Sequence, residues 1–531
     1  MPSLAAIITA ARAGSIGYAN ALFEAGGWGT RTDDSAALAT RARLLKDAAL
    51  RASGPDRLIL LKDAAQAYAA ADALRPQPYT RINEATMRFL AGDRARARIL
   101  AQALPGWMAA QPRLDETAYF IAATRAEAHL LCGAVDLAAQ AMREACAADP
   151  DGWADRATTL RQLTLICDGL DLAPDWLDPF RPPVSLSYAG HLGLAAADCG
   201  DLRQTIDRWM EDHSIGFGFG ALAAGGDIVL AEAILARGGE LHVVLPIGVE
   251  AFVAQSVTPY DPAWYPRFYA CLDAAQSVQC VTSLSGAYEP LATQLAADVA
   301  MGAAALNAQR LHSAVWQLLL TDGGPGRFGA GLGTQRIGER WRDKGRQHCI
   351  VGPRTAPVPA SSRAPVPEGR ADRRLATMLM ILFDGLDRFD EAGFADAVDS
   401  VIAPFRAACA AMAIQPDLAM PVGNALLVAF ADPDKAWDYA VALLAMPPLA
   451  LPLRIAGHHG LAHWLDLPPA LVGRATADCM AIAAAAMPGV LTASETMASA
   501  LCINRSAEII AEHVGEVGDT RLYALSPACR P

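Results

Sequence analysis

Two glycine motifs in the middle of the chain could bind an anion, because each stands just before a predicted helix. Gly225 and Gly226 precede the apolar segment 228–236, and Gly333 with Thr334 opens a second predicted helix. Glycine lets the backbone N–H groups at a helix start approach a phosphate closely, and the helix dipole adds a favourable field. The pattern therefore favours binding of a phosphate-bearing ligand.

Two side chains beside these motifs could transfer protons. His191 titrates near neutral pH, and a pocket could shift the pKa of Asp227 into the same range. The sequence pairs neither of them with a nucleophile, so we expect binding and not catalysis, with no catalytic residue and no metal ligand. The predicted ligand-binding residues are Gly190, His191, Gly225, Gly226, Asp227, Asp322, Gly333 and Thr334.

Strands and helices that alternate along residues 181–351 would position these residues. Such alternation is typical of a parallel α/β sheet. Ligands bind beyond the carboxyl ends of the strands in these sheets, so His191 and Asp227 should face one crevice. The strands that we expect are 184–191, 241–246 and, as the last of the sheet, 314–320, with helices at 202–210, at 228–236 and within 288–311.

The dinucleotide-binding pattern is incomplete here, because the second strand ends in Pro246 where an acidic ribose ligand is expected. Four residue pairs can be compared with known α/β domains: Gly190-His191, Gly226-Asp227, Leu245-Pro246 and Asp322-Gly323. On these pairs the segment resembles the SLOG group of Rossmann-like domains, which are proposed to sense or process nucleotide-derived ligands. The resemblance implies a nucleotide-type ligand. In the alternative that stays open, the glycines form tight turns and bind nothing.

A second set of motifs lies in residues 371–531, where four apolar segments of strand length are separated by turn residues. These segments are 378–385, 421–430, 451–460 and 487–494. The third contains Arg454, Ile455, His458 and Gly460, and the last contains Pro488, Gly489 and Ser494. In order and spacing they resemble the class III adenylyl/guanylyl cyclase domain.

The resemblance implies a chemistry that this chain lacks. The family uses two carboxylates that hold two metal ions, which bind the triphosphate and activate the ribose hydroxyl. The first carboxylate position falls on Leu382 and the second on Asn424. Leu offers a hard cation no ligand, and an amide offers one neutral oxygen. We therefore predict a cyclase fold without cyclase activity.

Three further positions that the family uses are also changed. The base-recognising Lys position falls on Met420, and the transition-state Asn and Arg positions fall on Ala477 and Ala481. Two alternatives stay open: Asp384 or Asp387 could replace the first carboxylate, and an active cyclase partner could supply missing residues to a heterodimer.

The N-terminal residues 1–180 show a helical pattern in which small residues recur. Gly133, Ala138, Met142, Ala145 and Pro150 have the spacing of the second helix of a tetratricopeptide repeat. Partial copies begin at Ala64 and Gly92, and the segments 78–86 and 90–93 resemble the TRAF-binding helical-repeat domain of apoptosis signal-regulating kinases. The resemblance implies a protein-binding scaffold, and the alternative is a generic Ala-rich bundle. Asn83 needs partners if it is buried and could contact a ligand if it is exposed.

Composition limits the class of protein. The 531 residues are 53% hydrophobic and include 56 acidic against 44 basic residues, a net charge of −12. This balance argues against a nucleic-acid surface and against anionic lipid. Eleven scattered cysteines with no C-x-x-C pair suggest reduced thiols, and we expect a cytoplasmic protein without a membrane segment.

We therefore predict a multidomain α and α/β protein. TPR-like helices occupy 1–180, a Rossmann or SLOG-like domain 181–351, a Pro-rich linker 352–370 and a degenerate cyclase-like α+β domain 371–531. The predicted function is signalling: a nucleotide-type ligand is sensed, a protein partner is bound, and an inactive cyclase-like domain forms a homodimer or a regulatory output. No cofactor beyond that nucleotide-derived ligand is expected. The alternative is an active class III cyclase that the N-terminal domains regulate.

Overall fold

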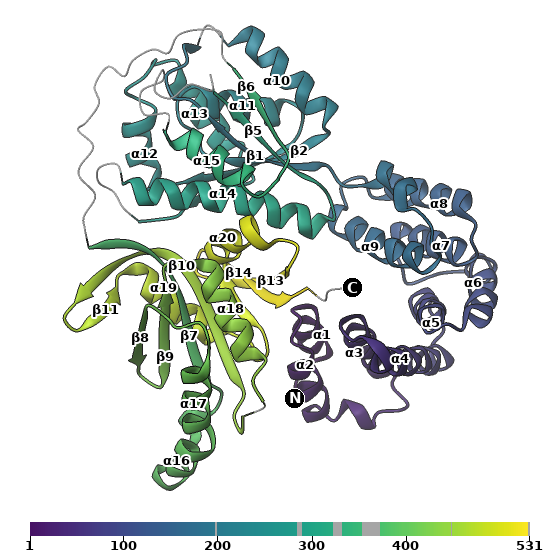
Figure 1. Cartoon of the computed structure of the whole chain (residues 1–531). Coiled ribbons are helices and arrows are strands. Elements are labelled where there is room, and N and C mark those ends of the chain that lie inside the picture. Colours follow the sequence, from purple (N-terminus) through teal and green to yellow (C-terminus); the bar gives the residue numbers. More distant parts are fainter. Residues whose placement is uncertain (197–198, 284–288, 322–331, 353–371, 448, 529–531) are drawn as a thin grey trace. The chain divides into compact units, whose positions relative to one another are not determined.

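The computed structural model describes residues 1–196, 199–283, 289–321, 332–352, 372–447 and 449–528. The chain forms two compact units, Met1–Pro182 with Arg310–His312, and Pro183–Gln309 with Ser313–Ala528 (Figure 1). The first is helical and the second contains a parallel sheet and a mixed sheet. A multidomain protein of helical and α/β parts is confirmed. The predicted linker lies outside the described residues except for Gly352.

The helical unit consists of consecutive helices, several of which pair as hairpins (Figure 1). The small residues of the predicted repeat pattern pack inside, since Ala64, Ala138 and Ala145 are fully buried. Gly92 and Gly133 follow helix ends with positive φ, as glycine after a helix C-terminus commonly does. Whether these hairpins are tetratricopeptide repeats stays a prediction. The helices are α1 (Leu4–Arg12), α2 (Ile16–Ala25), α3 (Ser35–Arg51), α4 (Gly54–Leu74), α5 (Pro78–Leu90), α6 (Arg94–Ala109), α7 (Ala118–Leu131), α8 (Val135–Ala148) and α9 (Trp153–Gly169).

The parallel sheet has the strand order β4-β3-β2-β1-β5-β6. The predicted strands and helices of this segment are present, but two expectations about its strands are wrong. Residues 215–220 were not predicted as a strand and form β2, so 241–245 belongs to the third strand of the chain and not to the second. Strand 315–320 is not the last, because His348–Val351 adds β6 beside it. The strands are β1 (Val184–Gly190), β2 (Ile215–Gly220), β3 (Glu240–Leu245), β4 (Ser277–Cys280), β5 (Val315–Leu320) and β6 (His348–Val351). The helices are α10 (Gly200–Asp212), α11 (Gly226–Ala236), α12 (Val249–Ser256), α13 (Trp264–Asp273), α14 (Pro290–Leu311) and α15 (Leu332–Arg342).

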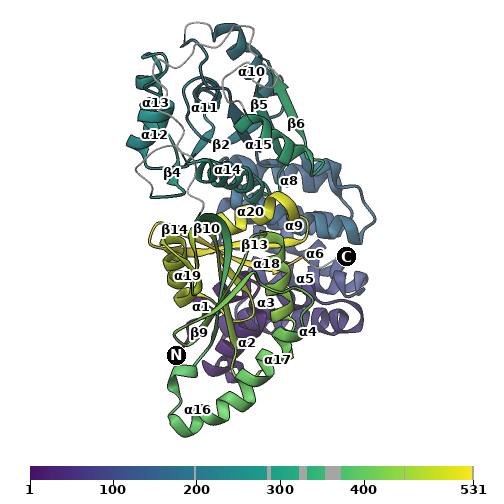
Figure 2. The same cartoon turned by 60° about the vertical axis from the view of Figure 1, so that its left-hand side comes forward.

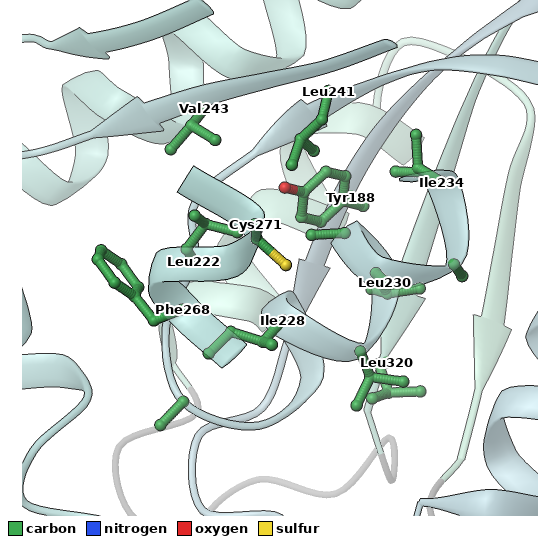
Figure 3. Packing of buried hydrophobic residues seen from close by; sticks show 14 of the residues in the cluster. Tyr188, Leu222, Ile228, Leu230, Ile234, Leu241, Val243, Phe268, Cys271 and Leu320 are labelled. Atoms are coloured by element: carbon green, nitrogen blue, oxygen red, sulfur yellow. The ribbon is translucent and has the colours of Figure 1, made fainter. Parts of the chain in front are cut away.

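Strand β2 explains part of the glycine richness of this module. Its glycines alternate with Phe217 and Phe219, so all the glycines point to one face. A Cβ on Gly218 would overlap Ile234 of α11, and one on Gly220 would lie 2.5 Å from the Tyr188 ring. Gly218 thus lets α11 pack closely on the sheet, and Gly220 makes room for the Tyr188 ring of β1. Figure 3 shows the resulting core, in which Ile234 of α11 lies near Tyr188 and Leu241 of the sheet.

The mixed sheet has the order β13-β14-β12-β10-β7-β9-β8, with β11 paired to β10. The predicted strand 421–430 is a hairpin, because Gly423 has φ +58 and forms the turn between β8 and β9. The strands are β7 (Arg373–Phe383), β8 (Leu418–Val422), β9 (Ala425–Phe430), β10 (Leu453–Asp466), β11 (Pro469–Val472), β12 (Leu491–Ser494), β13 (Ile509–Val517) and β14 (Thr520–Pro527). The helices are α16 (Glu391–Ala397), α17 (Ala403–Ala411), α18 (Pro433–Leu444), α19 (Arg474–Ala485) and α20 (Glu495–Arg505).

Helices cover both faces of this sheet (Figure 2). Alternate residues of β7 point to opposite sides, so Leu379 and Ile381 pack with α18 and α20, whereas Met378 and Met380 pack with α19. On the α19 side, the half-buried Leu382 lies where β7 approaches its end. This is the part of the sheet to which the cyclase resemblance assigns the metal site.

Candidate functional site

The predicted ligand-binding residues gather where the strand order of the parallel sheet reverses. From β1 the chain passes to β2, β3 and β4 on one side, and later to β5 and β6 on the other. The carboxyl ends of β1 and β5 therefore form the topological switch point at which such sheets bind ligands. Gly190 ends β1 and His191 follows it, and Thr321 follows β5.

Gly190 and Gly226 are in close backbone contact at this point. A Cβ on Gly190 would lie 2.5 Å from the Gly226 Cα, and one on Gly226 would lie 2.6 Å from the Gly190 Cα. The Gly226 N–H donates to the His191 carbonyl at 3.0 Å. Gly225, with φ +112, adopts a conformation that favours glycine. These contacts show that the glycines hold β1 against the start of α11.

Asp227 occupies the N-terminus of α11 with its own negative charge. Its carboxylate accepts a hydrogen bond from the Gly190 N–H at 2.7 Å and another from the Ala223 N–H at 3.1 Å. Burial raises the pKa of Asp227 to about 6, although the two backbone hydrogen bonds act to lower it. Asp227 therefore places its own negative charge at the start of α11 and already accepts two neighbouring amides outside the helix, which disfavours a phosphate there.

Near the end of β5, the side chains provide imidazole and hydroxyl groups where the start of α11 has a carboxylate. His191 is buried, and its Nε2 shares a hydrogen bond with Thr321 Oγ1 at 2.6 Å. The Thr334 hydroxyl, in the first turn of α15, donates weakly to the Gly190 carbonyl at 3.4 Å. His191, Thr321 and Thr334 thus lie around the switch point beside a second helix N-terminus.

The structure brings together most of the predicted site. Gly190, His191, Gly225, Gly226 and Asp227 are contiguous, Thr334 contacts Gly190, and Gly333 lies in the first turn of α15. Asp322 lies outside the described residues. Thr321 was not predicted, although its position directly after the apolar segment 314–320 was a usable signal. Ligand binding by this set stays a prediction.

We expect the cost of Asp227→Asn to depend on pH. Because the pKa of Asp227 is raised in the folded protein, the folded state binds the proton first as pH falls, and this carboxyl adds stability below pH 6. The cost of the substitution should therefore be about 1 kcal/mol larger at pH 5 than at pH 7. Urea unfolding of both proteins at each pH measures this difference. A cost that does not change with pH would contradict the raised pKa.

Asn83 has a structural explanation in the helical unit. It is buried, accepts a hydrogen bond from Lys46 Nζ at 2.8 Å and donates to the Tyr79 carbonyl at 2.9 Å. Lys46 also donates to Gln162 at 3.2 Å. Lys46 therefore connects α3 with α5 and α9, and Asn83 is a satisfied buried amide.

The motif residues of the mixed sheet also come together. Arg454 forms a backbone bridge with Pro488, and His458 Nδ1 shares a 3.0 Å hydrogen bond with Ser494 Oγ. Burial lowers the pKa of His458 to about 4, so this histidine is neutral at pH 7. The two motif segments lie on strands β10 and β12, which pair with each other.

The two carboxylate positions of the resemblance lie near each other, Leu382 towards the end of β7 and Asn424 in the turn before the neighbouring strand β9. Leu382 pairs with Ala425, the residue after Asn424, and with Arg454 on the other side. Asp384 lies two residues beyond Leu382 and forms an ion pair with Arg454 at 3.4 Å. Among the described residues, no group of three His, Cys, Asp or Glu side chains could hold a metal ion.

The remaining family positions carry no polar group. Met420 on β8 and Leu382 on β7 are half-buried in the apolar cluster under α19. Ala477 and Ala481 are exposed on α19, on the side that does not face the sheet. The side chain of Asp387 is outside the described set. The region thus contains the apolar Leu382 and Met420 next to the Arg454–Asp384 ion pair.

No protein-family model and no curated protein matches the sequence. Solved structures of cyclase domains do match, over less than a third of the chain. The adenylyl cyclase CyaB from P. aeruginosa is 13% identical, with 29% of this chain and 95% of that chain covered at a TM-score of 0.25. The guanylate cyclase domain of RhGC from Catenaria anguillulae, solved in complex with GTP, is 14% identical, with 30% and 100% covered at 0.25. The dimeric guanylyl cyclase domain of RhoGC from Blastocladiella emersonii is 16% identical, with 30% and 99% covered at 0.24.

In the part of the chain that the structure describes, every helix is too short or too polar to cross a bilayer.

Proposed function

We propose that this chain is a signalling protein whose cyclase-like domain makes no cyclic nucleotide. Its switch-point crevice, defined by His191, Thr321 and Thr334, would bind a nucleotide-type ligand, and its N-terminal helices would bind a protein partner. The cyclase-like domain would serve as a regulatory output and would form a homodimer. The observation that carries the proposal is the pairing of Leu382 with Ala425 beside Asn424, because it leaves the predicted metal position without a carboxylate.

The chemistry of cyclisation supports this proposal. Two divalent cations next to a triphosphate need anionic oxygen ligands, and uncharged Leu382 and Asn424 cannot balance that charge. Asp384 is the nearest carboxylate in sequence, but Arg454 already pairs with it. The transition state would also lack donors at Ala477 and Ala481, which costs electrostatic stabilisation.

We expect the purified chain to form no cyclic AMP or cyclic GMP from ATP or GTP with Mg²⁺ or Mn²⁺.

The double variant Leu382→Asp/Asn424→Asp should gain Mn²⁺ binding, measured by isothermal titration calorimetry, without a comparable gain in the rate of cyclic nucleotide formation. Leu382→Asn alone is the matched control, since it adds polarity but no charge. Wild-type turnover that disappears on Arg454→Ala or Asn424→Ala would favour the alternative of an active cyclase.

The ligand part of the proposal rests on the second donor set of the crevice. The start of α11 carries Asp227, whereas the start of α15 carries Thr334 near the His191–Thr321 pair. Hydroxyl, imidazole and helix N–H groups at one position suit a phosphate or a ribose hydroxyl.

A further inference from the structure

Helix α15 extends from the switch-point crevice to the helices of the mixed sheet. Its first turn contains Thr334, which contacts the Gly190 carbonyl. Near its other end Trp341 is fully buried and packs against Met301 of α14 and Ile503 of α20. One helix therefore contacts both the predicted ligand crevice and the cyclase-like domain.

Arg346, four residues after α15, holds the end of α20. Its guanidinium donates to the Cys502 carbonyl at 2.6 Å, to the Ile503 carbonyl at 3.1 Å and to the Ser506 hydroxyl at 2.9 Å. Carbonyls at a helix C-terminus have no partner within the helix, so a cation stabilises them. Arg346 thus caps a helix that belongs to the other sheet.

Helix α14 contacts both α15 and α20. Arg340 of α15 forms a 2.6 Å ion pair with Asp298 of α14. Ala305 and Leu306 of α14 belong to the same buried cluster as Met497 and Leu501 of α20. Packed helices of this kind shift together because close-packed interiors do not deform locally.

We propose that α15 couples the crevice to α20, so that a ligand in the crevice changes the local stability of the cyclase-like domain. This inference rests on the proposed ligand binding at the crevice. The coupling passes from Thr334 through α15 to Trp341 and Arg346, and from there to the C-terminal turn of α20. It would give the domain without cyclase chemistry a regulatory output.

Hydrogen–deuterium exchange on the full-length protein tests the coupling with ATP as the probe. ATP should slow exchange both at the crevice, residues 190–193 and 226–229, and in α20, residues 501–505. In Arg346→Ala the crevice should still be protected, while exchange in α20 becomes roughly tenfold faster and insensitive to ATP. Arg342→Ala is the matched control, because this exposed arginine donates to Gly338 of its own helix.

A second variant tests the coupling without a ligand. A Cβ on Gly338 would lie 2.5 Å from Leu319 Cδ1 of β5. Because Leu319 is buried and has little room to move aside, Gly338→Val should push α15 away from the sheet. Faster exchange in α20 of this variant would support the coupling, and unchanged exchange there would overturn it. If ATP protects the crevice but not α20 in the wild type, the coupling is wrong and ligand binding stands. If ATP protects neither region, the proposed ligand binding fails and the Gly338→Val result decides the coupling.

Discussion

Gly302→Ala should lower the free energy of unfolding by about 3 kcal/mol, although alanine normally stabilises a helix. Gly302 lies in α14 where this helix crosses α20. A Cβ at this position would lie 2.5 Å from the Ser499 Cα and would overlap the Ser499 carbonyl. Backbone atoms cannot move aside as a flexible side chain can, so the two helices must separate. The Arg346 contacts with α20 should weaken at the same time.

Urea unfolding followed by far-UV circular dichroism measures this effect. Gly106→Ala is the matched control, because Gly106 is also within a helix but a Cβ there meets no atom within 4 Å. That substitution should leave stability unchanged or raise it by about 0.5–1 kcal/mol. If Gly302→Ala behaved like the control, α14 and α20 would not cross as closely as described.

The sequence predicted most buried strands and helices of the second unit, but it missed the interior strand β2, whose alternating glycines do not form an apolar run. Segments such as 378–385 and 241–246 are continuous apolar runs that end at turn residues, which is why they could be recognised. The edge strands β4 and β6 have four residues each and alternate half-buried with exposed positions. They are too short to be distinguished from loops, so residues 314–320 were wrongly predicted as the last strand.

The candidate site was predicted as a set of residues but not as a set of contacts. His191 and Asp227 could be placed at one edge because parallel strands bring their carboxyl ends together. The contact of Gly190 with Gly226 depends on how closely α11 approaches β1, and no local pattern gives that distance. The capping of α20 by Arg346 joins residues more than 150 positions apart, which sequence periodicity cannot indicate.

Gly226→Val is expected to unfold the α/β module or to lower its melting temperature strongly. The new Cβ would lie 2.6 Å from the Gly190 Cα and 2.8 Å from Leu320 Cδ2, and the Gly190 backbone is fixed by Asp227. Strain against a backbone and loss of the Asp227 hydrogen bonds together should cost about 3–5 kcal/mol. Gly200→Val, at the start of α10 in the same module, is the matched control because its Cβ would meet no atom within 4 Å.

Thermal unfolding and ATP binding, measured on the same Gly226→Val protein, separate two roles for this glycine. A collapsed melting transition means that Gly226 holds β1 against α11, as the contacts with Gly190 and Leu320 indicate. A wild-type melting temperature with lost ATP binding would mean that the glycine faces a ligand, and it would contradict the close packing described here. Because Asp227 already fills the N-terminus of α11 with a carboxylate, we expect the first outcome. A phosphate would then have to bind at the N-terminus of α15. Thr334→Val should therefore weaken ATP binding and change the free energy of unfolding by less than about 1 kcal/mol.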